Sequence, residues 1–201
     1  MNTEKATVFV VDDDPSVRKA LARSIQAAGF DAKIFASARE FLDQSSTDGP
    51  GCIVLDVRMP GLSGLDLQAE LSARNIRTPI IFITGHGDIP ATVKAMKGGA
   101  VDFLTKPFKI TNLIGIIKEA VKKDERLRAS QAEKTKVQHR LQALTPRERA
   151  VLGLVVKGLL NKQIAVELGA AENTIKVHRG RVMQKMQVRS VAELVQAVQQ
   201  V

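Results

Sequence analysis

Four apolar runs of this chain end in polar side chains that could together handle a phosphoryl group. The residues that follow these runs are Asp12 and Asp13, Asp56, Thr84 and Lys106. Open α/β sheets bind their ligands at the carboxyl ends of the strands, so an acid placed where a buried strand ends is well sited for chemistry. These carboxylates, the hydroxyl and the ammonium are therefore the candidate site residues.

The charges at this edge imply a divalent ion. Three carboxylates crowded at a solvent-open edge repel one another unless a cation joins them. Hard oxygen ligands with room for water suit Mg²⁺, or Mn²⁺ in its place. One aspartate could then attack a phosphoryl group, and the acyl phosphate would need a nearby hydroxyl and fixed cation, for which Thr84 and Lys106 are the candidates. Asp14, which precedes Pro15, is instead interpreted as a helix N-cap.

The elements that must position these residues alternate along the first half of the chain. Short apolar runs, typical of parallel strands covered on both faces, lie at 8–11, 32–35, 52–55, 80–83 and 101–104. Helical patterns fill the gaps at 15–28, 38–45, 64–74, 89–98 and 110–123. Right-handed crossovers between these repeats predict a flavodoxin-like, doubly wound α/β sheet of order 2-1-3-4-5, which brings Asp12, Asp13 and Asp56 together.

Several motifs of this half resemble the receiver domain of two-component response regulators. They are Val-Val-Asp-Asp at 10–13, Leu-Asp-Val-Arg-Met-Pro-Gly at 55–61 with Ser63-Gly64, Ile-Thr-Gly-His-Gly-Asp at 83–88, Gly99-Ala100, and Lys106-Pro107-Phe108. Residues 85–88 resemble the FixJ-type subgroup in particular, and His86 is interpreted as a loop residue because it has no partnered ligand at metal-binding spacing.

The resemblance implies a role for each candidate residue. Asp56 is the phosphoacceptor, Asp13 is a direct Mg²⁺ ligand, Asp12 is a ligand through water, and the Arg58 carbonyl is a backbone ligand. Thr84 and Phe103 are then a coupled switch pair. Lys106 pairs with the phosphate, and its bond to Pro107 is expected to be cis, which costs only about 0.5 to 1 kcal/mol before proline.

Length and charge divide the chain in two. With 201 residues it can form two domains, and we expect a receiver at 1–120, a helical linker at 121–143 and a second domain at 144–201. Residues 1–118 carry 14 Lys and Arg against 13 Asp and Glu, whereas residues 119–201 carry 16 against 8. That excess suggests a polyanionic partner for the second half, either nucleic acid or an anionic membrane surface, with a solvated basic face as the alternative.

Other classes of protein are not favoured by the sequence. Apolar stretches are too short for a membrane span or signal peptide, so we expect a cytoplasmic protein that is not inserted in a membrane. The single cysteine, Cys52, opens an apolar strand and is expected to pack in the core. Residues 119–143 have high helix propensity and lack Gly and Pro, which predicts that the receiver's last helix continues into a largely exposed helical linker.

The second domain has clear helix boundaries. Thr145-Pro146-Arg147-Glu148 and Ser190-Val191-Ala192-Glu193 are capping boxes. Between them, Gly158 ends one helix, Asn161 can cap another that runs through Leu168, and a third spans Glu172 to about Met186. Four short helices in a basic all-α bundle predict a helix-turn-helix domain.

The third of these helices has two distinct faces. Ile175, Val182 and Met186 share one side, while the opposite side carries Asn173, Lys176, Val177, Gly180, Arg181 and Gln184. An exposed valine between basic residues suits a recognition helix, because lysine can reach guanine or phosphate and valine can contact a thymine methyl. A plain surface helix with one exposed valine is the alternative.

This half resembles the LuxR-type output domain of NarL/FixJ regulators. The motifs are Leu-Thr-Pro-Arg-Glu-Arg-Ala-Val-Leu at 144–152, Asn-Lys-Gln-Ile-Ala at 161–165, Thr-Ile-Lys-Val-His at 174–178 and residues 183–186. The resemblance implies that Lys176 and Val177 face the bases and that Lys162, Arg179, Arg181 and Lys185 contact phosphates. The sequence departs from the family at Ala171, where a capping Ser or Thr is usual, and at Gly180, which often carries a side chain.

The preferred function is a DNA-binding transcriptional response regulator. A sensor histidine kinase phosphorylates Asp56, which alters DNA binding through formation of a homodimer, and the regulator acts at promoter DNA with RNA polymerase. The protein is then not an enzyme, apart from self-phosphorylation and autodephosphorylation at Asp56.

Two alternatives remain open from the sequence. Asp12-x-Asp14 with Thr84 and Lys106 superficially matches a HAD-type phosphatase, but that match leaves Asp56 unexplained, and the later acidic pair it needs falls only at Asp124-Glu125 in the linker. The other alternative is a regulator that works without phosphorylation and whose receiver only binds proteins.

Overall fold

The computed structural model describes residues 5–85 and 89–199, and the chain divides into two compact units, Met1–Arg128 and Ala129–Val201. His86, for which a loop position was predicted, lies outside the described residues. Each unit has its own core, and each is described separately below.

The first unit alternates strands with helices, as the periodicity predicted. Its elements are β1 (Thr7–Val11), α1 (Pro15–Ala27), β2 (Asp31–Phe35), α2 (Ala38–Gln44), β3 (Gly51–Asp56), α3 (Gly64–Ala73), β4 (Ile80–Thr84), α4 (Ile89–Lys97), β5 (Asp102–Thr105) and the start of α5 (Ile110–Gln142). The strands are parallel and ordered β2-β1-β3-β4-β5, which confirms the predicted topology.

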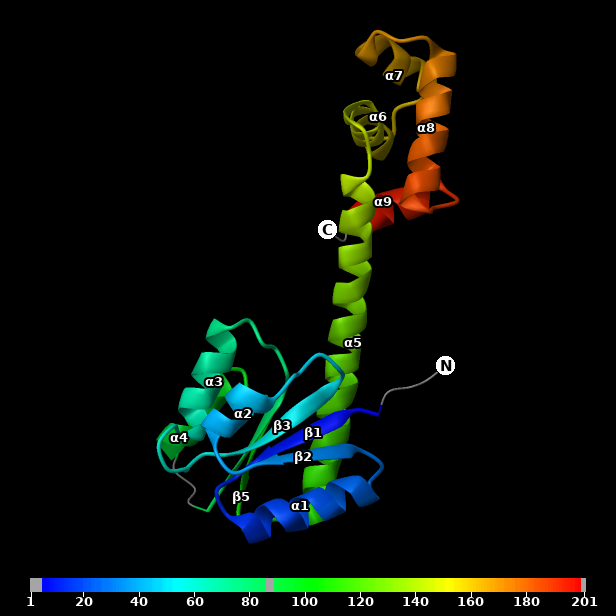
Figure 1. Cartoon of the computed structure of the whole chain (residues 1–201). Coiled ribbons are helices and arrows are strands. Elements are labelled where there is room, and N and C mark those ends of the chain that lie inside the picture. Colours follow the sequence, from blue (N-terminus) through cyan, green and yellow to red (C-terminus); the bar gives the residue numbers. More distant parts are fainter. Residues whose placement is uncertain (1–4, 86–88, 200–201) are drawn as a thin grey trace. The chain divides into compact units, whose positions relative to one another are not determined.

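Helices cover both faces of this sheet, with α2, α3 and α4 on one side and α1 and α5 on the other (Figure 1). Strand β3 shows why its sequence is apolar throughout. Ile53 and Leu55 point into the cluster beneath α2, α3 and α4, whereas Cys52 and Val54 point into the cluster beneath α1 and α5. Burial of Cys52 raises the pKa of its thiol to about 12, in agreement with a packing role.

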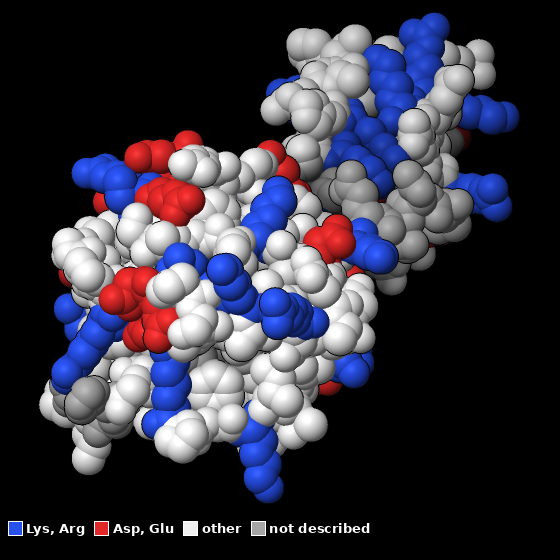
Figure 2. Space-filling view, turned by 60° about the horizontal axis from the view of Figure 1, so that its bottom comes forward, with Lys and Arg blue, Asp and Glu red and all other residues white. Residues whose placement is uncertain are grey.

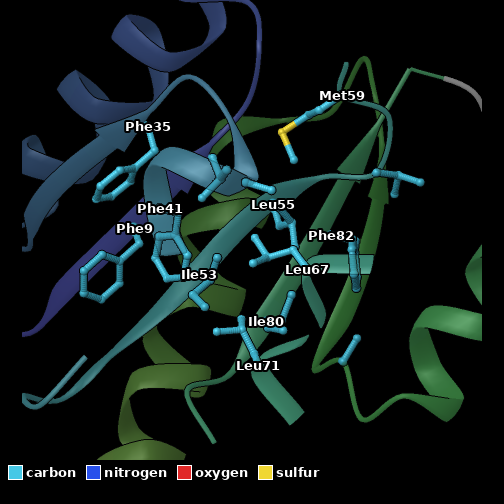
Figure 3. Close-up of a cluster of buried hydrophobic side chains, with 14 of the residues drawn as sticks. Phe9, Phe35, Phe41, Ile53, Leu55, Met59, Leu67, Leu71, Ile80 and Phe82 are labelled. Atoms are coloured by element: carbon cyan, nitrogen blue, oxygen red, sulfur yellow. The ribbon is translucent and has the colours of Figure 1, made fainter. Parts of the chain in front are cut away.

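The core under α2 and α3 is rich in aromatic rings. Phe41 of α2 meets Phe9 and Phe35 edge-on, with ring centroids 5.6 and 5.2 Å apart (Figure 3). The aliphatic side chains Leu67 and Leu71 of α3 complete this layer. Beneath this layer β1 and β3 pair in parallel with Val11 opposite Leu55, so the carboxyl ends of the two strands lie side by side.

The second unit is helical. It contains the end of α5, then α6 (Pro146–Val156), α7 (Asn161–Leu168), α8 (Glu172–Met186) and α9 (Val191–Gln199). Ile175, Val182 and Met186 of α8 are fully buried, as the two-faced pattern predicted. The capping box at Thr145 and Glu148 is present, and Gly158 and Gly169 have the left-handed backbone that ends a helix.

One predicted cap is wrong. Asn161 is the first residue of α7 and not its N-cap, which is Leu160. The Asn161 amide oxygen accepts a hydrogen bond from Arg179 of α8 at 2.9 Å, while Gln163 accepts one from the Leu160 N–H at 2.8 Å. A tertiary partner has therefore replaced the local capping interaction.

The predicted linker is one continuous helix with the receiver's last helix, because α5 runs from Ile110 to Gln142. Most residues of the linker at 121–143 are exposed, as predicted. Val121 and Asp124 are nevertheless buried in the first unit and Val137 in the second, and the longest uninterrupted exposed stretch is 129–136.

Candidate functional site

The loop after β1 brings two of the predicted carboxylates to the edge of the sheet. Asp12 is completely buried, and its Oδ1 accepts a hydrogen bond from the Asp14 N–H at 2.9 Å. Asp13 is exposed. Asp14 caps α1 as predicted, because its side chain accepts from the N–H groups of Ser16 and Val17.

Asp56 ends β3, next to this loop. Its side chain is almost completely buried, and Oδ1 accepts a hydrogen bond from the Arg58 N–H at 3.1 Å. Carboxylate oxygens of Asp12, Asp13 and Asp56 lie within 4.8 Å of one another. The convergence predicted from the strand order is therefore present.

Lys106 brings a positive charge to these acids. Its Nζ lies 2.7 Å from Oδ2 of Asp12 and 2.9 Å from Oδ2 of Asp56. The Lys106 N–H donates to the Thr84 carbonyl at 2.7 Å, and the peptide bond to Pro107 is cis, as the resemblance implied. The side chain of Lys106, which follows β5, thus reaches the acids at the carboxyl ends of β1 and β3.

Burial and charge oppose one another at this site. Desolvation raises the pKa of Asp12, although the hydrogen bond from Lys106 acts against that shift. Burial disfavours the charge on Lys106, but hydrogen bonds to Asp12 and Asp56 outweigh it and raise the pKa of the ammonium. One ammonium among three carboxylates leaves net negative charge, so this donor set fits a hard divalent cation.

The predicted switch residues lie on neighbouring strands. Thr84 is the last residue of β4 and is buried, and Phe103 is the half-buried second residue of β5. Phe103 pairs with Phe82 across the strands, with ring centroids 6.3 Å apart. Thr84 therefore lies one strand away from Asp56, at the same edge of the sheet.

The outward face of α8 is the second candidate site. Lys176 and Arg181 are exposed, and the Val177 side chain is 47% exposed. Lys162 of α7 is exposed too. In the view of Figure 2, Lys and Arg side chains cover much of the second unit and few acids interrupt them, whereas the first unit shows both signs. Such a surface can bind a polyanion.

The two other cations predicted to contact phosphate are partly buried and make polar contacts within the second unit. Arg179 donates to Asn161, as described above. Lys185 donates to the buried Glu148 Oε2 at 2.7 Å and to the Ala143 carbonyl at 3.2 Å. Lys185 thereby joins α8 to the start of α6, in addition to the apolar contacts between these helices.

Sequence reasoning missed three polar contacts that the structure shows. Arg18 of α1 donates to the Asp12 carbonyl at 2.6 Å, Lys185 pairs with Glu148, and Arg128 pairs with Asp124 on α5. Only the last left a sequence signal, the four-residue spacing of opposite charges on one helix. The Arg18 contact depends on how the loop before α1 folds, and the Lys185 contact depends on the packing of α8 against α6.

Comparison with known proteins assigns both halves of the chain. The family model described as the response regulator receiver domain matches residues 8–118, and the model described as bacterial regulatory proteins of the luxR family matches residues 142–198. Among the described residues, no helix is long and apolar enough to cross a bilayer.

Relatives of similar length share both parts. Nodulation protein W of Bradyrhizobium diazoefficiens is 52% identical over 191 residues, which cover 95% of this chain and 84% of that protein. The transcriptional regulatory protein FixJ of Rhizobium meliloti is 45% identical over 192 residues, 94% of this chain and 93% of FixJ. The solved structure of the response regulator StyR is similar with a TM-score of 0.92 and 47% identity, over 98% of this chain and 100% of StyR.

Proposed function

Because this chain belongs to the two-component response regulators, with a receiver domain followed by a LuxR-family DNA-binding domain, we propose that phosphorylation of Asp56 by a sensor histidine kinase switches its DNA binding. The family makes the chain a transcriptional regulator and not an enzyme. The phosphatase alternative is therefore rejected. Asp14, which belongs to the phosphatase-like motif, is the N-cap of α1.

The observation that carries this proposal is the contact of Lys106 with both Asp56 and Asp12. In the proposed reaction an Asp56 carboxylate oxygen attacks the phosphorus of a phosphohistidine, the P–N bond breaks, and the imidazole leaves with the bonding electrons and accepts a proton. Lys106 stabilises the negative charge that gathers on the phosphoryl oxygens, and the Thr84 hydroxyl donates to one of them.

Mg²⁺ is the proposed cofactor, with Mn²⁺ able to replace it. When bound, it neutralises charge on the carboxylates and on the phosphoryl oxygens. Asp13 and Asp56 would hold it directly, Asp12 through water, and Arg58 through its backbone carbonyl. The 4.8 Å grouping of the three carboxylates supports this assignment.

Dimerisation is the proposed link between the receiver and DNA. Ile89, Val93 and Met96 of α4 are 76%, 45% and 44% exposed and follow a helical spacing that places them on one face. An apolar ridge of this kind suits a subunit interface. We propose that phosphorylation, through Thr84 and Phe103 on the adjoining strands, promotes pairing of two receivers by this face.

The outward face of α8 is the proposed DNA-reading surface. Lys176 and Val177 contact bases in the major groove, and Lys162 and Arg181 contact phosphates. Arg179 already donates one hydrogen bond to Asn161, and Lys185 donates to Glu148 and Ala143. Each would contact a phosphate through its remaining N–H donors. A dimer would read two half-sites of promoter DNA and act there on RNA polymerase.

Labelling with acetyl phosphate tests the central assignment. The wild type should acquire one phosphoryl group when Mg²⁺ is present, and the variant Asp56→Asn should acquire none, while Asp48→Asn, an exposed acid, serves as the matched control. Full labelling of Asp56→Asn would overturn the assignment. Failure of the wild type to label with Mg²⁺ would favour a receiver that acts only as a protein-binding module.

A further inference from the structure

A buried acid lies where the composition of α5 indicates an exposed linker. Asp124 is only 3% exposed, although it is flanked by the exposed residues Lys123 and Glu125. Its Oδ2 accepts a hydrogen bond from the Gly51 N–H at 3.0 Å and another from Arg128 Nε at 2.7 Å. A buried carboxylate requires such partners, because an unpaired charge in this position would be strongly destabilising.

Arg128 extends the contact to the loop before β3. Its Nη1 donates to the Asp48 carbonyl at 2.9 Å and its Nη2 to the Thr47 carbonyl at 2.7 Å. Since Nε donates to Asp124, all three nitrogens of the guanidinium donate hydrogen bonds. The planar fork of an arginine suits this arrangement, in which two loop carbonyls and one carboxylate surround the group. We call Asp124 and Arg128 the α5 anchor.

The α5 anchor contacts the start of a fully buried strand of the receiver. Gly51 begins β3, all of whose residues are buried, and Asp56 ends the same strand. A Cβ atom on Gly51 would lie 2.1 Å from the Thr7 carbonyl oxygen, so β1 and β3 approach closely at this point. The Thr7 N–H also donates to the Pro50 carbonyl at 2.9 Å. The start of β3 is therefore fixed to β1, and the anchor fixes α5 to both.

Beyond the anchor, α5 has little tertiary support. Residues 129–136 are all exposed, and a helical segment of this length is marginal in water without packing. The α5 segment that follows joins the second unit, where Val137 is buried and Arg140 donates to the Met186 carbonyl. The exposed segment thus joins two parts of the helix that are each held within their own unit.

We propose that the α5 anchor is a coupling device, which must hold the first part of the helix to the receiver for phosphorylation of Asp56 to change DNA binding. This inference rests on the function proposed above. Without the anchor, residues 121–128 fray from the receiver, and a change in the receiver no longer reaches the helix that leads to the DNA-binding unit. Phosphorylation itself is unaffected, because the anchor lies at the opposite end of β3 from Asp56.

Two anchor variants and a neighbouring control test the proposal in the full-length chain. Arg128→Gln removes the charge that pairs with Asp124, and Asp124→Asn keeps an acceptor for the Gly51 N–H but removes the ion pair. Arg126→Gln changes an exposed arginine of the same helix. For each protein we would measure acetyl-phosphate labelling, hydrogen exchange of the amides of residues 121–128, and affinity for a DNA fragment selected from a random pool by the labelled wild type.

Both anchor variants should label as fast as the wild type, exchange at 121–128 at least about tenfold faster, and lose most of the gain in DNA affinity on labelling. Arg126→Gln should behave as wild type in all three measurements. The coupling role is overturned if exchange rises but the gain in affinity persists. The anchor itself is overturned if exchange stays at the wild-type rate.

The exchange measurement separates this proposal from the proposed function. If the wild type labels but gains no DNA affinity, the proposed phosphorylation switch fails, and the coupling role fails with it. Faster exchange in the anchor variants would then still establish the structural anchor. A variant that loses labelling as well would show that the anchor supports the phosphoacceptor site, which contradicts the proposed separation of the two ends of β3.

Discussion

The ammonium of Lys106 lies 2.9 Å from Oδ2 of Asp56, although 50 residues separate the two along the chain. The same nitrogen lies 2.7 Å from Oδ2 of Asp12, so one ammonium contacts the acids at the ends of two strands. This arrangement places positive charge beside the proposed nucleophile before any phosphodonor binds. Preorganised charge of this kind lowers the barrier for transfer of an anionic group.

Replacing Lys106 by Gln should slow acetyl-phosphate labelling of Asp56 by roughly 100- to 1,000-fold, the range found when one preorganised donor is removed. The measurement is the initial labelling rate at saturating Mg²⁺, with the exposed Lys109→Gln as control. A rate within about twofold of the wild type would mean that Lys106 only balances charge in the resting protein.

Mg²⁺ should stabilise the receiver. Binding to the folded state alone adds about 2.7 kcal/mol to the free energy of unfolding when the free ion is at 100 times its Kd. Thermal unfolding followed by circular dichroism is suitable, since the chain has no Trp or Tyr to report by fluorescence. Asp13→Asn should lose most of this increase. An equal increase in that variant would place the ion elsewhere.

Acid should weaken the attachment of α8 to α6. The hydrogen bond from Lys185, and the bond from the Thr145 N–H, lower the pKa of Glu148 to about 2. A glutamate in the unfolded chain has a pKa of about 4.3. The stabilisation is therefore complete above that pH and is lost as the pH falls towards 2.

Amide hydrogen exchange in α8 would measure this effect. The wild type should be better protected than Glu148→Gln at neutral pH, and the difference should shrink progressively below about pH 4. A difference that stays constant as the pH falls to about 2 would show that the ion pair between Glu148 and Lys185 is not the source of the protection.

Gly180→Ala should stabilise α8 by about 0.5 to 1 kcal/mol, because alanine has the higher helix propensity. Apart from the neighbouring residues and backbone of its own helix, no heavy atom of the described residues lies within 4 Å of the Cβ that would be added. Gly158→Ala is the matched contrast: its Cβ is equally unobstructed, but its φ of +85° disfavours any L side chain, so that variant should be destabilised. Thermal unfolding of both variants tests the opposite signs.

Lys176→Ala should weaken binding to the selected DNA fragment by about 1 to 3 kcal/mol and relax preference at one base pair, as expected for a base contact. Binding to unrelated sequences should change much less. Competition assays across single-base variants of the fragment provide the measurement. Lys176 is a phosphate contact instead if affinity falls equally for all sequences and DNA binding releases about one counterion fewer, which makes the dependence of affinity on salt concentration shallower.

Particular residues show how far the sequence determines this protein. The strand runs, the cap at Asp14, the capping box at Thr145 and the buried stripe of α8 were all predictable, because side-chain periodicity and capping are local properties. The strand order followed from short right-handed connections, which few topologies satisfy. It is this order that brings Asp12, Asp13 and Asp56 to one edge.

The tertiary structure alone decided where several polar groups find their partners. Asp124 lies in a segment whose composition indicates solvent, yet it accepts a hydrogen bond from Gly51, 73 residues earlier in the chain. Asn161 could cap its own helix but instead accepts from Arg179, and Lys185 pairs with Glu148, 37 residues away. The local sequence fixes which residues can donate or accept, but the partner depends on which elements pack together, since a buried polar group bonds to whatever that packing brings within reach.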